Sequence, residues 1–207
     1  MRKRWIKVWS VPGGAWFPVT LLLTLLFLTG GLAGCAMASW VGGSGSEGLA
    51  SYIRSYLLAA QEGVGSSPSV FALCWDVFRY PVAVLILGFT ALGLIGIPLA
   101  FAARGFFLSF AVSSFVRMFG GHGFLLAAVV FGIPGVISIP VLFVLGAQGW
   151  MASRTMAERL SHSGRRALPY DRLYWTRCGA CAVGLLLCVW VERFLTAELL
   201  TALAGSL

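Results

Sequence analysis

Cysteine and histidine residues are the first candidates for chemistry in this chain. Cys178 and Cys181 have the two-residue spacing of a metal-binding or redox pair. No second cysteine pair or nearby histidine completes such a site, so two small packing residues in an apolar helix are the simpler interpretation. His122 and His162 belong to loops that the arrangement derived below places on opposite sides of a membrane. We therefore expect no catalytic, cofactor-binding or metal-binding residues.

Two charged residues stand inside otherwise apolar stretches. Arg104 lies in the run from Pro81 to Val116, and Glu192 lies in the last apolar stretch. A charge at the centre of a bilayer costs about 2.5–3.5 kcal/mol on insertion scales, so such residues reach an interface or serve a function. Glu192 could form a structural ion pair with Arg104 or Arg193, or it could line a polar path.

Small residues beside Arg104 recur at helical spacing. Gly105, Ser109 and Ser113 are four residues apart, so they form one stripe on a helix. Gly30 and Gly34 form a G-x-x-x-G pair in the first apolar stretch. Small residues let helix backbones approach closely in lipid, and we expect both sets to be helix-packing surfaces.

The composition indicates an integral membrane protein. The chain has 207 residues, of which 59% are hydrophobic and 11% are charged, against about a quarter charged in soluble domains. The net charge of +8 does not indicate a nucleic-acid partner, because ten of the fifteen basic residues flank apolar stretches. Four lie within residues 2–7 and six within residues 154–177. Such clusters mark the cytoplasmic side of a membrane.

The apolar stretches predict an all-α polytopic membrane protein with about five transmembrane helices in a single domain, residues 1–207. The N-terminus is expected in the cytoplasm and the C-terminus outside. The expected spans are residues 17–38, 81–97, 98–119, 124–150 and 178–203, with an outer segment at 41–80 and a basic cytoplasmic loop at 151–177.

The boundary between the second and third spans comes from length. Residues 81–119 would form a helix about 58 Å long, close to twice the hydrocarbon thickness of about 30 Å. A turn near Gly96-Ile97-Pro98 is expected to divide them. Arg104 would then lie about 9 Å beyond the turn, where its side chain reaches the cytoplasmic face.

Two prolines interrupt the fourth span. Pro134 and Pro140 each lack a backbone donor, so this helix is expected to be kinked or broken.

Cys35 ends a segment, Leu32-Ala33-Gly34-Cys35, that fits the pattern of a bacterial lipoprotein cleavage site. The other spans already anchor the chain in the membrane. A helix contact through Gly30 and Gly34 is therefore the preferred interpretation of this segment.

Four sequence blocks, taken in order, resemble one known family. The blocks are Leu87 to Gly93, Arg104 to Val112, the Pro134 and Pro140 pair, and Val191 to Thr196. Over about Val70 to Leu200 the chain resembles the stage II sporulation protein M family. Two departures concern single sites: Ala197 stands where the family usually has proline, and Gly135 and Val136 replace polar residues.

The resemblance implies a non-enzymatic integral membrane protein of endospore-forming bacteria, without a cofactor. Its implied role is forespore engulfment, in which it anchors and localises a peptidoglycan-degrading complex with stage II sporulation proteins D and P. The implied location is the mother-cell membrane at the engulfing septum. A homo-oligomer is an open expectation.

A transporter or permease subunit is the alternative. Arg104, Glu192 and the interrupted fourth span support it, because buried charges and broken helices often line substrate paths.

Overall fold

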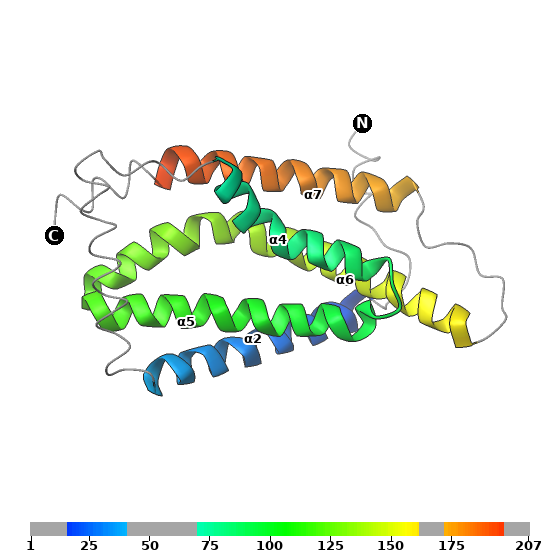
Figure 1. The fold of residues 1–207 in the computed structure, drawn as a ribbon, viewed down its shortest axis with the longest axis horizontal. Coiled ribbons are helices and arrows are strands. Elements are labelled where there is room, and N and C mark those ends of the chain that lie inside the picture. The colour runs from blue at the N-terminus through cyan, green and yellow to red at the C-terminus, as the bar shows by residue number, and fades with distance from the viewer. Residues whose placement is uncertain (1–15, 41–69, 162–171, 197–207) are drawn as a thin grey trace.

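The computed structural model describes residues 16–40, 70–161 and 172–196, and every regular element within these ranges is helical. Successive α-helices run in alternating directions (Figure 1). The elements are α2 (Trp16–Trp40), α4 (Val70–Gly88), α5 (Gly93–Ala127), η1 (Ala128–Gly132), α6 (Ile133–Ser161), α7 (Arg172–Val191) and η2 (Glu192–Thr196), the two η elements being π-helical turns. Residues 41–69 of the outer segment, 162–171 of the basic loop with His162, and 197–203 of the last span lie outside the described ranges.

Four of the described helices are long and apolar enough to cross a membrane. They are Trp16–Trp40, Gly93–Arg117, Ile133–Arg159 and Arg172–Phe194. Helix α4 has 19 residues and would be about 28 Å long, close to the hydrocarbon thickness of about 30 Å. The four candidate helices correspond to the first, third, fourth and fifth of the about five expected spans, and a fifth span at α4 stays a prediction.

The turn before α5 differs from the expected one. It lies at residues 89–92, and Pro98 lies inside α5. A proline inside a helix leaves the carbonyl four residues earlier without its helical donor. Here that carbonyl belongs to Leu94, and the indole Nε1 of Trp150 donates a hydrogen bond to it at 3.2 Å. The expected boundary at residues 97 and 98 is therefore wrong.

The observed turn is held by α6. Ser153, which is fully buried, donates hydrogen bonds to the carbonyls of Leu87 at 3.1 Å and Thr90 at 2.8 Å. A Cβ atom at Gly88 would lie 2.9 Å from the Cα of Gly149, so the two backbones nearly touch. The hydrogen bonds and this close contact fasten the turn to α6.

The chain reverses again at Gly120, inside the element labelled α5. Its backbone angles are φ 57° and ψ −132°, which lie outside the helical region. This φ favours glycine, because a side chain there meets the backbone. The segment after Gly120 leads through η1 into α6.

The irregular part of the fourth predicted span precedes its prolines. In η1 the amide of Ile133 bonds to the carbonyl of Ala128, five residues back. This wider turn gives the ring of Pro134 room beside the carbonyl of residue 130. Helix α6 continues through Pro140, and a kink or break at the prolines stays a prediction.

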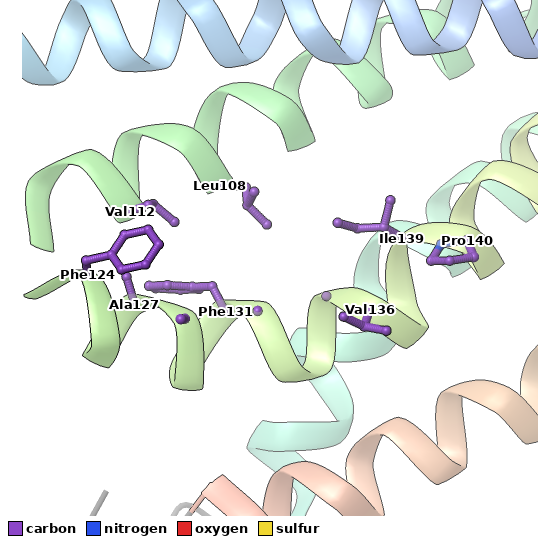
Figure 2. A pocket seen from close by; sticks show the side chains of 11 residues that line it. Leu108, Val112, Phe124, Ala127, Phe131, Val136, Ile139 and Pro140 are labelled. Atoms are coloured by element: carbon purple, nitrogen blue, oxygen red, sulfur yellow. The ribbon is translucent and has the colours of Figure 1, made fainter. Parts of the chain in front are cut away.

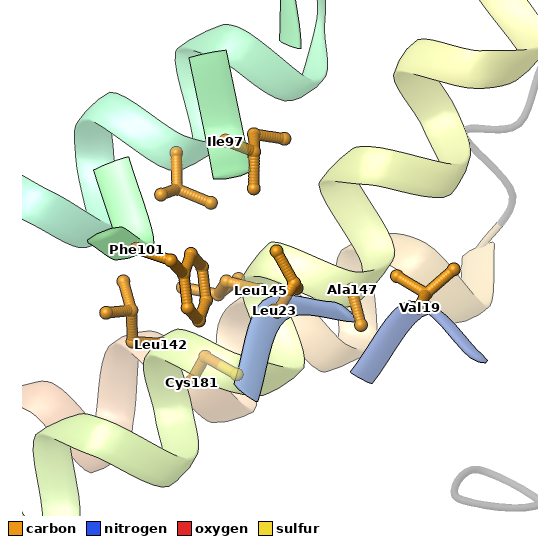
Figure 3. Packing of buried hydrophobic residues seen from close by; sticks show 9 residues of the cluster. Val19, Leu23, Ile97, Phe101, Leu142, Leu145, Ala147 and Cys181 are labelled. Carbon is orange, nitrogen blue, oxygen red and sulfur yellow. The ribbon is translucent and has the colours of Figure 1, made fainter. Parts of the chain in front are cut away.

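All five helices contribute to one hydrophobic core (Figure 3). Phe101 lies at its centre, edge to face with Phe143 at 5.0 Å between ring centroids. A Cβ atom at Gly146 would lie 2.4 Å from the Phe101 ring, so this glycine makes room for it. The buried members are Val19, Leu23, Val84, Ile97, Phe101, Leu142, Leu145, Ala147 and Cys181.

Candidate functional site

The small-residue stripe of α5 lies against α2, in the most extensive helix contact of the described chain. A Cβ atom at Gly30, Gly34 or Gly105 would lie 2.1–2.3 Å from a carbonyl oxygen of the opposite helix. Real side chains do not fit at such a distance, so glycine is required at all three positions. The two helices run in the same direction (Figure 1). We call this surface the α2–α5 contact.

Serines and an arginine extend the α2–α5 contact along α5. The Ser109 hydroxyl lies against Gly31, where a Cβ atom would be 2.9 Å from it. Ser113 donates a hydrogen bond to the sulfur of Cys35 at 3.2 Å. Arg117 donates to the carbonyl of Ala38, in the last turn of α2. The structure thus brings the five predicted packing residues, Gly30, Gly34, Gly105, Ser109 and Ser113, to one interface.

Arg104 lies near the middle of its membrane span. It stands eleven residues after Gly93 and thirteen before Arg117, the ends of the span. At 1.5 Å per residue it lies about 17 Å beyond the start of α5. The expected distance of about 9 Å from the turn is therefore corrected, because the turn lies earlier in the chain than expected. A position of Arg104 near the cytoplasmic face stays a prediction.

Two guanidinium groups make cation–π contacts with the aromatic ring of Tyr80. Arg104 lies over the ring at 4.8 Å from its centroid, and Arg79 lies at 5.0 Å. Arg79 is exposed, whereas Arg104 is half-buried. A cation–π contact contributes about 0.5–1 kcal/mol at an exposed site and about 2 kcal/mol or more where water is excluded. The Tyr80 ring therefore stabilises the charged guanidinium of the half-buried Arg104.

Glu192 lies in the same part of the bundle. It begins η2, which contacts α4 and α6. One turn earlier, the buried thiol of Cys188 donates to the carbonyl of Pro134 at 3.3 Å. The charges of Arg104 and Glu192 both act on this thiol, which places both predicted intramembrane charges around Cys188. We call the group Tyr80, Arg104, Cys188 and Glu192 the charged centre.

An apolar cavity of about 420 Å³ lies between α5 and the η1–α6 segment (Figure 2). A Cβ atom at Gly132 or Gly135 would meet only side chains of its own helix, at 4.0 and 3.6 Å. Such a lining accommodates hydrocarbon and offers almost no polar group to a solute. The lining residues are Leu108, Val112, Phe124, Ala127, Ala128, Phe131, Gly132, Gly135, Val136, Ile139 and Pro140.

The two candidate cysteines occupy different surroundings. Cys181 lies in the hydrophobic core, and Cys178 packs against its edge. Among the described residues no group of three or more histidine, cysteine, aspartate or glutamate side chains could hold a metal ion.

Several polar residues that connect the helices were not predicted from the sequence. Gln148 is buried and donates to the carbonyl of Tyr174 at 3.1 Å. Ser153 bonds to the turn before α5, and Trp150 bonds to Leu94 in the first turn of α5. Their signal was present, because Gln148 and Ser153 interrupt an apolar run. Such residues in lipid mark contacts between helices.

A family model described as Stage II sporulation protein M matches residues 23–198, more than four fifths of the chain. The chain belongs to the stage II sporulation protein M family. The matched range contains both Arg104 and the stripe from Gly105 to Ser113. No individual curated protein and no solved structure matches the chain. Family membership and four apolar helices identify a sporulation-related membrane protein.

Proposed function

We propose that this protein is a non-enzymatic membrane scaffold in forespore engulfment. It would anchor and localise a peptidoglycan-degrading complex with stage II sporulation proteins D and P, in the mother-cell membrane at the engulfing septum. The family match carries this proposal.

The packing of the bundle supports a scaffold role. The α2–α5 contact brings backbones together where no side chain fits, and the α4–α6 contact does the same at Gly88 and Gly149. Helices whose backbones touch keep a constant spacing, because a close-packed interior has low compressibility. A scaffold needs this property, since its exposed segments must stay at set positions for a partner to bind.

The test is recruitment of the partners. We would replace residues 41–69 by a Gly-Ser segment of equal length and co-purify the variant with proteins D and P from sporulating cells. We expect partner recovery to be lost while membrane insertion survives. The matched control replaces residues 162–171, on the opposite predicted side, and should keep the partners. Full recovery with the first variant would contradict the proposal.

A transporter or permease subunit is the second candidate, because Arg104 lies at mid-span and Glu192 lies near it. Under this function, Glu192→Gln should abolish transport in a correctly folded protein. Under the scaffold function, Glu192→Gln should lower only the folding yield. The neighbouring genes also discriminate: an ATPase gene favours transport, and sporulation genes favour a scaffold.

A further inference from the structure

A second, very small cavity adjoins the charged centre. Its volume is about 10 Å³, close to the smallest that holds one water molecule, about 10–15 Å³. It is lined by Val77, Tyr80 and Pro81 of α4, Arg104 of α5, and Ser138, Ile139 and Leu142 of α6. Because Arg104 lies near the middle of a candidate membrane span, we expect this cavity to lie away from both membrane surfaces.

Val77, one of the lining residues, has a carbonyl that a proline has released. Pro81 lies inside α4 and has no N–H, so the carbonyl of Val77, four residues earlier, loses its helical donor. Leu94 stands in the same relation to Pro98, and there the Trp150 indole supplies the donor. A carbonyl at membrane depth costs several kcal/mol if no donor reaches it. The Val77 carbonyl therefore calls for a donor from this cavity.

Two further lining residues carry polar side chains. Ser138 is buried, with 9% of its surface exposed, and its hydroxyl can both donate and accept. Arg104 adds a guanidinium group, which only donates. The three residues thus offer an acceptor (Val77), a donor (Arg104) and a hydroxyl that is both (Ser138). A buried water makes about two to four hydrogen bonds, so these groups match its needs.

We propose that one water molecule occupies this cavity and bridges the Val77 carbonyl, the Ser138 hydroxyl and the Arg104 guanidinium. The water solvates Arg104 from one side, and the Tyr80 ring contacts it at 4.8 Å. This hydration adds to the other contacts that stabilise the charge of Arg104. The inference rests on the lining of the cavity and holds for either proposed function.

X-ray hydroxyl-radical footprinting in lipid nanodiscs tests the inference, because radicals formed from a bound water modify the side chains beside it. Leu142 and Leu145 make a matched pair on α6, with 3% and 6% of their surfaces exposed. Only Leu142 lines the cavity. We expect Leu142 to be modified several-fold faster than Leu145. Equal rates in the wild-type protein would overturn the proposal.

A variant locates the water. Ser138→Val removes the hydroxyl and fills the space, so the rate at Leu142 should fall to that at Leu145. The control is Ser114→Val, whose hydroxyl bonds to the carbonyl of Phe110 in its own helix at 2.8 Å. A rate at Leu142 that survives Ser138→Val in folded protein would contradict the assignment. Should Ser138→Val fail to fold, Pro81→Ala restores the amide donor to Val77 and should also lower the rate at Leu142.

Discussion

Helix α5 contacts its neighbours through two surfaces of opposite character. Toward α2 it offers mainly glycine and serine, so that the backbones come together, and Arg117 bonds to the carbonyl of Ala38 at one end of this contact. Toward α4 and α6 it offers Arg104, which lies over the Tyr80 ring of α4 and lines a small cavity together with Val77 of α4. Lipid tails are as apolar as leucine, so burial of apolar side chains adds little to helix association in a membrane. Close backbone packing and polar contacts can still hold helices together. Helix α5 relies mainly on close packing toward α2 and on the contacts of Arg104 toward α4 and α6.

The difference between the two surfaces predicts different sensitivities. The α2–α5 contact depends on side-chain size, because its distances leave no room for a Cβ atom. The charged centre depends on charge and hydrogen bonding, because a guanidinium at mid-span must be solvated by the protein. Substitutions that change only size or only polarity should therefore separate them.

Gly105→Leu should have the largest effect, and it acts on the α2–α5 contact. The new Cβ atom would lie 2.1 Å from the Phe27 carbonyl oxygen, so we expect a loss at or above the upper end of about 1–3 kcal/mol. The measurement is the free energy of unfolding by steric trapping in bicelles. Gly179→Leu is the control, because nothing lies within 4 Å of a Cβ atom there. Similar losses for both variants would contradict a role for close packing.

Arg104→Leu should come next, and it removes the charge while keeping an apolar side chain. We expect a loss of about 2 kcal/mol or more, against about 0.5–1 kcal/mol for Arg79→Leu on the same Tyr80 ring. The two variants are compared by the same unfolding measurement. In a Tyr80→Leu background their difference should shrink, and an unchanged difference would exclude the ring as its source.

Trp150→Phe should have a smaller effect, at the turn that sets the depth of Arg104. It removes the donor to the Leu94 carbonyl, which should cost about 1 kcal/mol or more for a carbonyl left without a partner. Pro98→Ala restores the helical donor, so the cost of Trp150→Phe should fall in that background. Additive effects in this double-mutant cycle would show that the indole does not compensate for the proline.

Ser113→Ala should have the smallest effect. It removes one hydrogen bond to Cys35 from the α2–α5 contact and shortens the side chain by the hydroxyl oxygen alone. Hydrogen bonds between membrane helices contribute about 0.6 kcal/mol on average, and we expect a loss of that order in the same assay. A loss as large as that of Gly105→Leu would mean that polarity, rather than close approach, holds α2 to α5.

Much of the architecture was predictable from residue types and run lengths. A helix is the structure in which a lipid-embedded segment satisfies its own backbone, so long apolar runs predict spans. The first span was expected at residues 17–38, and α2 covers Trp16–Trp40. The stripe from Gly105 to Ser113 was visible because its spacing places it on one helix face. Its partner was not visible, because spacing alone does not name the opposite helix.

By itself, then, the sequence determined the membrane class, the helical secondary structure and the small-residue faces, since each follows from local composition and periodicity. Only the tertiary structure decided where α5 begins and how deep Arg104 lies. Pro98 is a helix-ending signal when considered alone, but Trp150, 56 residues away from Leu94, supplies the hydrogen bond that Pro98 cannot make. That contact keeps Pro98 within α5. The turn lies at residues 89–92 instead, where Ser153 bonds to it, and Arg104 lies near the middle of its candidate span.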